Sequence, residues 1–246
     1  MKIIIIFLLA ITFYYLKFVM HLSIDWKSLY RKGFKKIDNA FGVFCYCGKQ
    51  GHGKTYSAIK FCIERKLNTN CLIITNVLSF NCFSDTVFIT DIYEMIDYVI
   101  NYMEEFYKTH NQDEEPNILI FYDEIFTILN KNKKIDETIL SFLSQLRKRR
   151  IILITTAQEW LEVNVTFRRY VRFQIDCNML SFPITKSALI LNYINDSEQM
   201  KWSNEENEYV APRIATNFGK GNLQIIQSYD TFETIKVSSK IKNPKV

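Results

Sequence analysis

The feature of this sequence that most limits its fold is a glycine-rich octapeptide that directly follows a short apolar run. The octapeptide satisfies the spacing G-x-x-x-x-G-K-[ST] at every position, and its residues are Gly48, Lys49, Gln50, Gly51, His52, Gly53, Lys54 and Thr55. In this spacing the glycines let backbone N–H groups curl around phosphates, Lys54 neutralises the β- and γ-phosphate oxygens, and the Thr55 hydroxyl binds Mg²⁺. The sequence therefore predicts that ATP and Mg²⁺ bind between a buried strand, residues 42–47, and a helix that begins at residue 54.

A second motif lies at the end of a strand predicted over residues 117–122. This apolar run ends in two carboxylates, Asp123 and Glu124. A carboxylate at a strand tip can hold the water shell of Mg²⁺ beside Thr55, and the next acid can orient and deprotonate an attacking water. Any strand-to-turn junction can also end in acids, but the upstream glycine-rich motif favours the catalytic interpretation. Asp123 is therefore predicted as a metal ligand and Glu124 as the catalytic base of an ATPase, since GTPases and small-molecule kinases usually lack a base there.

Strands and helices alternate through the middle of the chain. Apolar runs predict strands over residues 42–47, 71–75, 87–90, 117–122 and 151–155, and apolar spacing predicts helices over residues 54–66, 91–107 and 136–149. Asp91 is the expected N-cap of the second helix. The alternation indicates βαβ units and a mainly parallel sheet with helices on both faces. The predicted fold class is an α/β P-loop NTPase, RecA-like, of the class with an additional strand and a catalytic glutamate.

The segment after residue 169 contains shorter apolar runs, which predict strands over residues 170–175, 187–194, 224–228 and 232–237. No linker rich in Pro, Gly or Ser separates these strands from the preceding ones, so we expect them to extend the same domain. The predicted ATPase domain therefore covers residues 41–237, and a basic tail follows at 238–246.

The six cysteines form no C-x-x-C pair and have no histidine nearby at ligand spacing. A zinc site or a redox pair is therefore not expected. We expect the cysteines to be buried, reduced thiols. Such thiols are typical of a reducing cytosolic compartment.

The strand predicted over residues 151–155 leads into a polar segment that ends at Gln158. In P-loop ATPases with a catalytic glutamate, an additional strand lies between the strand of the phosphate-binding loop and the acidic strand. The tip of that strand points at the γ-phosphate, so Gln158 is predicted to sense whether this phosphate is present. The alternative interpretation is a polar residue that caps the strand-to-loop junction.

Four basic residues, 147–150, come directly before this strand in a chain with a net charge of +5. The strand 151–158 spans about 26 Å, which places Arg147 at the edge of the sheet opposite the nucleotide. Arg147 therefore cannot reach the γ-phosphate of its own subunit, but it can complete a neighbour's site as an arginine finger or contact DNA in a central pore. Arg168 and Arg169 are rival candidates, and a solvated helix end is the alternative to either role.

Residues 1–22 are apolar and almost uncharged, and five basic residues follow between positions 27 and 36. A run of about 20 apolar residues is long enough for one helical span of a bilayer. The positive-inside rule then places the basic juxtamembrane segment, residues 23–40, and everything after it in the cytoplasm. The prediction is a single-pass anchor in the cell membrane, with the ATPase domain cytoplasmic. A cleaved signal peptide is the alternative, although no A-x-A-like cleavage site follows the run.

Four segments together resemble a known family. They are G-K-Q-G-H-G-K-T at 48–55, I-F-Y-D-E-I-F at 120–126, F-L-S-Q-L-R-K-R-R-I-I-L-I-T-T-A-Q at 142–158 and Y-D-T-F-E-T-I at 229–235. In this combination the chain is similar to the zonula-occludens-toxin-like ATPases of filamentous bacteriophages, which belong to the broader class of DNA-pumping motors. The resemblance covers residues 40–237 and implies the same roles for the two motifs above, with Gln158 as the sensor. Arg147 matches the position of the family's arginine in the helix before the sensor strand.

The resemblance implies a membrane-anchored ring of identical subunits that hydrolyses ATP with Mg²⁺. Such a ring drives phage DNA, with single-stranded DNA favoured, through the host membrane during virion assembly and extrusion, and phage coat proteins are further expected partners. One alternative is a genome-packaging ATPase of a membrane-containing phage. Another is a non-hydrolysing, nucleotide-gated membrane scaffold, against which the intact glycine-rich and acidic motifs count.

The chain departs from the filamentous-phage form of the family in one respect. There the transmembrane helix follows the ATPase domain and leads to an external domain, whereas the apolar run here is N-terminal. We therefore expect no external portion that meets an outer-membrane channel, which would suit a phage of a host without an outer membrane.

Overall fold

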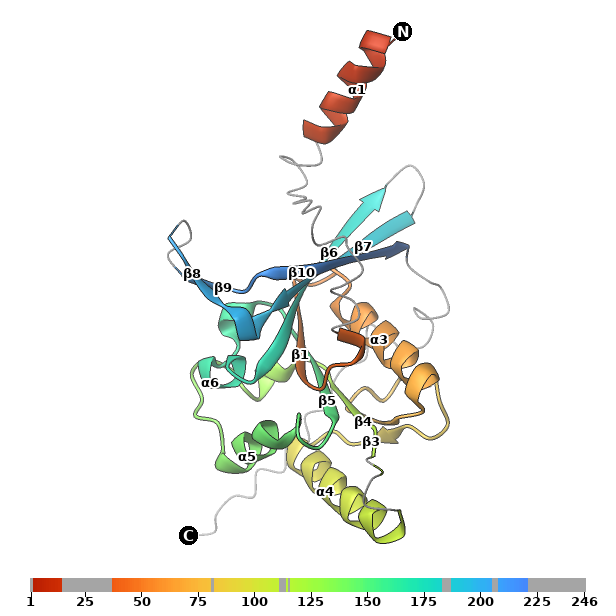
Figure 1. Cartoon of the computed structure of the whole chain (residues 1–246), viewed down its shortest axis with the longest axis vertical. Coiled ribbons are helices and arrows are strands. Elements are labelled where there is room, and N and C mark those ends of the chain that lie inside the picture. The colour runs from red at the N-terminus through yellow and green to blue at the C-terminus, as the bar shows by residue number, and fades with distance from the viewer. Residues whose placement is uncertain are drawn as a thin grey trace, which may run out of the picture.

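An eight-stranded sheet runs through the computed structural model (Figure 1), which describes residues 2–14, 37–80, 82–110, 114, 116–182, 187–204 and 208–220. The strand order is β10-β7-β6-β1-β5-β4-β2-β3. The strands from β6 to β3 are parallel, and β7 and β10 are added antiparallel at one edge. The strands are β1 (Gly42–Cys47), β2 (Leu72–Thr75), β3 (Val87–Phe88), β4 (Ile118–Tyr122), β5 (Ile151–Ala157), β6 (Val171–Phe182), β7 (Ser187–Asp196) and β10 (Arg213–Lys220). Two short strands, β8 (Lys201–Ser203) and β9 (Glu208–Val210), form a separate antiparallel pair.

The parallel part of the sheet confirms the predicted α/β architecture. β5 lies between β1, which leads into the glycine-rich loop, and β4, which ends at the acidic pair. The additional strand of the predicted class is therefore present. Every residue of β1, β4 and β5 is buried, as expected for parallel strands that are covered on both faces.

Helices cover both faces of this sheet. They are α3 (Lys54–Thr69), α4 (Ile92–Thr109), α5 (Glu137–Gln145) and α6 (Val165–Arg168), with 3-10 turns η2 (Ile125–Thr127), η3 (Trp160–Glu162) and η4 (Ser197–Gln199). A further helix, α1 (Lys2–Tyr14), does not pack on the sheet (Figure 1). α3 packs Ala58, Ile59 and Cys62 into the core on one face, and α4, α5 and α6 contribute to the core on the other face. α4 begins after the predicted cap, because the Asp91 carboxylate accepts hydrogen bonds from the backbone N–H groups of the first turn.

The structure differs from the predicted elements in several places. The helix predicted over residues 136–149 ends at Gln145, because the chain turns sharply into β5 and Arg150 adopts a left-handed conformation with φ of 52°. β10 was not predicted, because an antiparallel strand with partly exposed side chains does not form a continuous apolar run. The strands predicted over residues 224–228 and 232–237 lie outside the described residues.

The N-terminal helix α1 covers 13 residues and contains no acidic residue in its first turn and no basic residue in its last. Among the residues that the structure describes, no helix is long and apolar enough to cross a membrane. The predicted anchor, residues 1–22, extends beyond α1 into positions 15–22, which lie outside the described residues.

All six cysteines are free thiols, and five of them are buried, as predicted. Burial raises the pKa of the Cys62 and Cys177 thiols above the ordinary value. Thiols in such surroundings stay protonated and pack as small apolar side chains.

Candidate nucleotide site

The glycine-rich loop connects the end of β1 to the start of α3, as the motif requires. Gly48 and Gly53 have positive φ angles of 151° and 79°. A Cβ atom on Gly48 would lie 2.7 Å from the backbone oxygen of Cys177 in β6, so only glycine fits at this position. Gly53 is the N-cap of α3 and has left-handed backbone angles, so the N-terminus of this helix faces the loop. The Lys54 ammonium donates to the backbone oxygen of Lys49 at 3.4 Å, which keeps this charge at the loop.

The hydroxyl of Thr55 meets the carboxylate of Asp123 across the site. Thr55 Oγ1 lies 3.4 Å from both carboxylate oxygens of Asp123, which follows the last residue of β4. A hydroxyl beside one carboxylate fits Mg²⁺, which prefers oxygen ligands and takes its remaining ligands from waters and substrate phosphates. These two side chains would hold the ion, which would neutralise charge on the phosphates. The structure thus brings the two predicted metal ligands together.

Burial raises the pKa of the Asp123 carboxyl above its ordinary value. The Thr156 hydroxyl, the Lys54 ammonium and the Thr55 hydroxyl oppose this shift, whereas the negative charge of Glu124 adds to it. A divalent cation at this carboxylate would favour its ionised form, so protons and Mg²⁺ compete for the site.

Glu124 directly follows Asp123 and adopts a left-handed conformation, with φ of 55° and ψ of 50°. This conformation is uncommon for a residue other than glycine, and such strain is found at functional sites. The Glu124 N–H donates to Thr156 Oγ1 at 2.8 Å. The same Thr156 hydroxyl donates to a carboxylate oxygen of Asp123. Thr156 therefore bridges the two acidic residues and fixes the turn that orients Glu124.

Asn76 is a second support of the acidic pair. It directly follows β2, and its side-chain amide forms two hydrogen bonds with the backbone of Asp123. The Asp123 N–H donates to Asn76 Oδ1 at 2.8 Å, and Asn76 Nδ2 donates to the Asp123 carbonyl at 3.2 Å. Sequence reasoning missed both Asn76 and Thr156. Each is the polar residue at the carboxyl end of a strand beside β4, and that position is the signal that identifies them.

The predicted sensor, Gln158, lies beside the loop but not between the acidic residues. It is exposed and lines a cleft of about 450 Å³ together with Gly48, Lys49 and His52. Thr156, two residues earlier on β5, contacts both acidic residues instead. Of these two β5 residues, the geometry therefore assigns the direct contact with the acidic pair to Thr156, and a sensing role for Gln158 stays a prediction.

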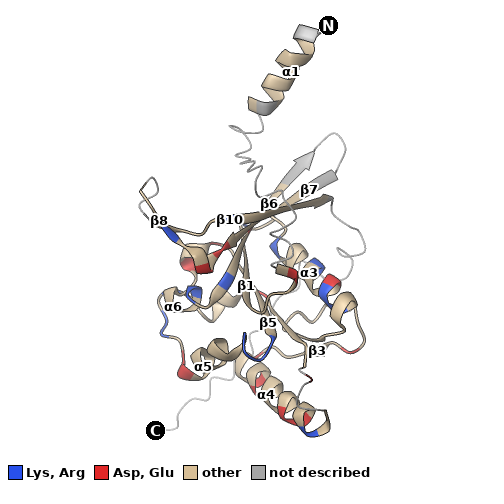
Figure 2. Cartoon of the chain, in the orientation of Figure 1, with Lys and Arg blue, Asp and Glu red and all other residues tan. Residues whose placement is uncertain are grey.

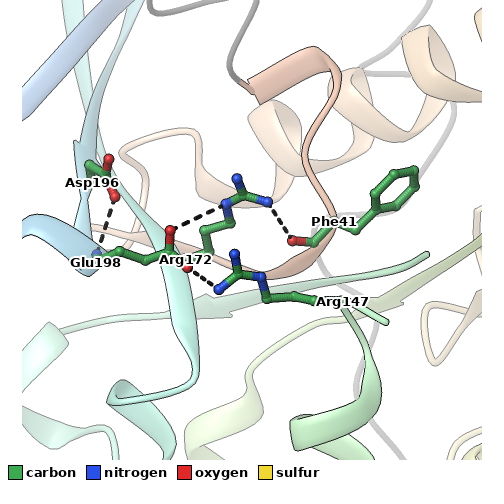
Figure 3. A network of polar contacts seen from close by, with 5 residues as sticks. All are labelled: Phe41, Arg147, Arg172, Asp196 and Glu198. Carbon is green, nitrogen blue, oxygen red and sulfur yellow. Dashed lines mark hydrogen bonds and ion pairs between the residues drawn. The ribbon is translucent and has the colours of Figure 1, made fainter. Parts of the chain in front are cut away.

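Arg147 lies at the other end of the sheet from the glycine-rich loop. Its side chain packs beside Gly42, the first residue of β1, where an added Cβ would meet Arg147 Cγ at 3.0 Å. Its guanidinium forms an ion pair with Glu198 of η4, and Arg172 approaches the second oxygen of that carboxylate at 3.8 Å while it donates to the Phe41 carbonyl (Figure 3). Arg147 is thus held by a carboxylate within its own chain, beside the residue at which β1 begins and not beside the loop that follows β1.

The sheet with β5 between β1 and β4, the loop geometry and the Thr55–Asp123 pair together define a protein of the P-loop NTPase class. Residues 42–189 match the family model for zonular occludens toxin (Zot), and the chain belongs to this family. This match confirms the resemblance seen in the sequence. Comparison with curated proteins found no match.

Several solved structures are similar to this chain. The N-terminal domain of zonular occludens toxin from Neisseria meningitidis has 14% identity and a TM-score of 0.47, over 78% of this chain and 100% of that one. The genome packaging NTPase B204 from Sulfolobus turreted icosahedral virus 2, in complex with ATP-gammaS, has 13% identity and a TM-score of 0.48, over 72% and 99%. The flagellar accessory protein FlaH from Methanocaldococcus jannaschii has 13% identity and a TM-score of 0.42, over 78% and 97%.

Proposed function

We propose that this protein is a membrane-anchored ATPase motor that drives phage DNA through the host membrane during virion assembly and extrusion. The observation that carries the proposal is the complete constellation at the nucleotide site, with Thr55 and Asp123 together and Glu124 held next to them. The resemblance to filamentous-phage assembly ATPases, within the Zot family, supports the cellular role.

Each residue of the site has a role in the proposed hydrolysis. The loop N–H groups and Lys54 bind the β- and γ-phosphates, and Thr55 with Asp123 would hold Mg²⁺, which would neutralise charge on these phosphates. Glu124 accepts a proton from the water whose oxygen attacks the γ-phosphorus, and ADP leaves as its bond to the γ-phosphorus breaks. Asn76 and Thr156 act as positioning residues, because they fix the backbone that carries both acids.

The proposed anchor is the apolar run of residues 1–22, of which α1 covers the first part. Apolar side chains are exposed around this helix, with Ile4, Phe7 and Leu9 each about two-thirds exposed (65%, 66% and 64%). Such a surface is unfavourable in water and favourable in lipid, which supports insertion into a bilayer. The basic residues between positions 27 and 36 support a cytoplasmic ATPase domain.

The proposed assembly is a ring in which one subunit's arginine completes the neighbour's site. Arg147, or else Arg168 or Arg169, is the candidate, and Arg147 would have to leave Glu198 to act in this way. Mixing Arg147→Ala protein with Lys54→Ala protein should restore part of the activity, because one supplies the intact pocket and the other the arginine. No restoration in any of the three arginine combinations would exclude an arginine finger from these positions.

The test of the function is DNA transport by the full-length protein in lipid vesicles with the ATPase domain outside. Single-stranded circular DNA should become nuclease-resistant inside the vesicles when ATP and Mg²⁺ are added. Lys54→Ala, which cannot bind the phosphates, is the matched control and should protect no DNA. Protection of double-stranded DNA alone would favour genome packaging over extrusion, and hydrolysis without any protection would contradict the proposal.

A further inference from the structure

A large cleft opens beside the nucleotide site on the β6–β7–β10 part of the sheet. Its volume is about 1170 Å³, which exceeds the range of about 300–1,000 Å³ typical of pockets for small molecules. The floor is formed by β6, β7 and β10, and the walls come from the η3–α6 segment, from η4 and from β9 with the residues that follow it. A cleft of this size and shape suits an extended chain more than a compact ligand.

The floor of the cleft is a row of polar side chains on adjacent strands. Gln174 and Asp176 of β6 lie opposite Asn195 and Tyr193 of β7. The amides of Gln174 and Asn195 donate to the two carboxylate oxygens of Asp176, at 2.9 and 2.7 Å. The Arg213 guanidinium lies 4.0 Å above the Tyr193 ring. The two amides satisfy the hydrogen-bonding capacity of the Asp176 carboxylate, and the positive charge of Arg213 offsets its negative charge.

The walls combine guanidinium groups with aromatic rings. Arg168 and Arg169 line one side, and the Arg168 guanidinium lies 5.7 Å from the centre of the Trp160 ring. Tyr209 of β9 also lines the cleft, with 68% of its surface exposed. Figure 2 shows positive charge at α6 on the same side of the molecule as β8. The remaining carboxylate at the cleft, Glu198, already pairs with arginines (Figure 3).

A groove that pairs positive charge with accessible aromatic rings has the chemistry that binds single-stranded nucleic acid. Arginines contact the backbone phosphates, and the rings stack on unpaired bases, whose faces are hidden in a duplex. We propose that this cleft binds a single strand of DNA, with Arg168, Arg169 and Arg213 on phosphates and Trp160 and Tyr209 on bases. This inference rests on the proposed function, and it assigns the substrate strand to a specific part of the fold.

The cleft is connected to the nucleotide site by a short segment. Trp160, Leu161 and Asp176 line both the large cleft and the smaller one beside Gly48, Lys49 and Gln158. The segment from Gln158 to Arg169 therefore passes from the glycine-rich loop along one wall of the strand-binding cleft. A change at the γ-phosphate that moves Gln158 would shift the wall that contacts the DNA.

The experiment measures binding of fluorescein-labelled oligodeoxythymidylate to the full-length protein in nanodiscs, by anisotropy at several salt concentrations. Arg169→Ala should weaken binding and make the slope of log K against log salt less steep by about 0.7, because one phosphate contact is lost. Tyr209→Ala should weaken binding at least about fivefold and leave the slope unchanged, because a stacking contact is lost instead. Tyr209→Phe keeps the ring and should bind as the wild type does.

Lys108→Ala is the matched charge control, since Lys108 is exposed in the last turn of α4. If the wild type binds DNA and none of the cleft variants weakens that binding, the cleft is not the site, and the proposed function stands. If Lys148→Ala weakens DNA binding instead, the site lies at the basic run of residues 147–150. Failure of the wild type to bind any DNA would overturn the DNA motor itself. If Arg169→Ala or Tyr209→Ala loses its oligomeric state by light scattering, the cleft is a subunit interface and the proposal is wrong.

Discussion

The two halves of the sheet place their polar residues differently. In the nucleotide half, β1 to β5, the strand interiors are apolar and the functional side chains stand at the carboxyl ends, where Asn76, Asp123 and Thr156 meet. In the cleft half, β6, β7 and β10, polar side chains such as Gln174 and Asn195 lie within the strands and form a floor. Strand ends converge on a point and suit a small ligand such as a nucleotide. A strand face that carries polar side chains along its length extends over several residues and suits a long ligand.

The largest effect on ATP turnover is expected when the proposed catalytic base of the nucleotide half, Glu124, is replaced. Glu124→Gln keeps the size and polarity of the side chain but removes its ability to accept a proton. ATP should still bind, and turnover should fall by at least about 10². Steady-state hydrolysis and nucleotide binding are the measurements, and Glu104→Gln, an exposed position on α4, is the control. Comparable hydrolysis in the Gln variant and the wild type would remove Glu124 from its role.

The next effect tests how the strand ends are held together. Asn76→Ala leaves the buried backbone N–H and carbonyl of Asp123 without their partner, which should lower the free energy of unfolding by about 1–3 kcal/mol. Chemical denaturation of the full-length protein measures this change, and turnover should fall with it. Asn101→Ala, at an exposed position of α4, should change neither. A stable Asn76→Ala protein would show that β2 and β4 hold the acidic turn without this amide.

A somewhat smaller effect on turnover is expected from a test of whether Thr156 or Gln158 acts on the acidic pair. Thr156→Val removes the hydroxyl that bridges Asp123 and Glu124 and should slow turnover by about tenfold, which corresponds to about 1.4 kcal/mol. Thr156→Ser keeps the hydroxyl and should restore most of the rate. If Gln158→Ala slows turnover more than Thr156→Val does, the exposed residue rather than the bridging one governs hydrolysis.

The smallest effect is expected on the pH dependence of stability, which one aspartate from each half of the sheet tests. Burial raises the pKa of both Asp123 and Asp176. A carboxyl whose folded-state pKa is raised contributes stability that is fully present below its unfolded pKa and is lost as pH rises through the folded pKa. Asp123→Asn and Asp176→Asn should each remove this loss, so the variants should be more stable than the wild type at neutral pH without nucleotide. Thermal unfolding across acidic to neutral pH measures it, and a variant that is less stable at neutral pH would contradict the sign.

The two halves also differ in how far the sequence predicted them. The glycine-rich loop, Asp123 and the presence of the parallel strands followed from motif spacing and apolar runs, because both are local in sequence. The place of β5 between β1 and β4 followed from the class of P-loop ATPases with a catalytic glutamate. Asn76 and Thr156 could not be assigned, because their importance depends on which strands lie beside β4. The cleft was not predicted either, since its floor and walls come from β6, β7, η3 and β9, and mixed polar strands give only a weak periodicity.

The contact between Gly48 and β6 has a consequence for how the motif evolves. The first glycine of a phosphate-binding loop is usually explained by the ligand, but here a backbone oxygen of the neighbouring strand leaves no space for a Cβ. Selection on this position therefore acts through the order of the strands as well as through the nucleotide. In a descendant in which β6 lay farther from β1, this contact would no longer exclude alanine at position 48, and the positive φ of 151° would be the remaining structural reason for glycine. The first glycine of the motif therefore reflects the neighbouring strand as well as the ligand.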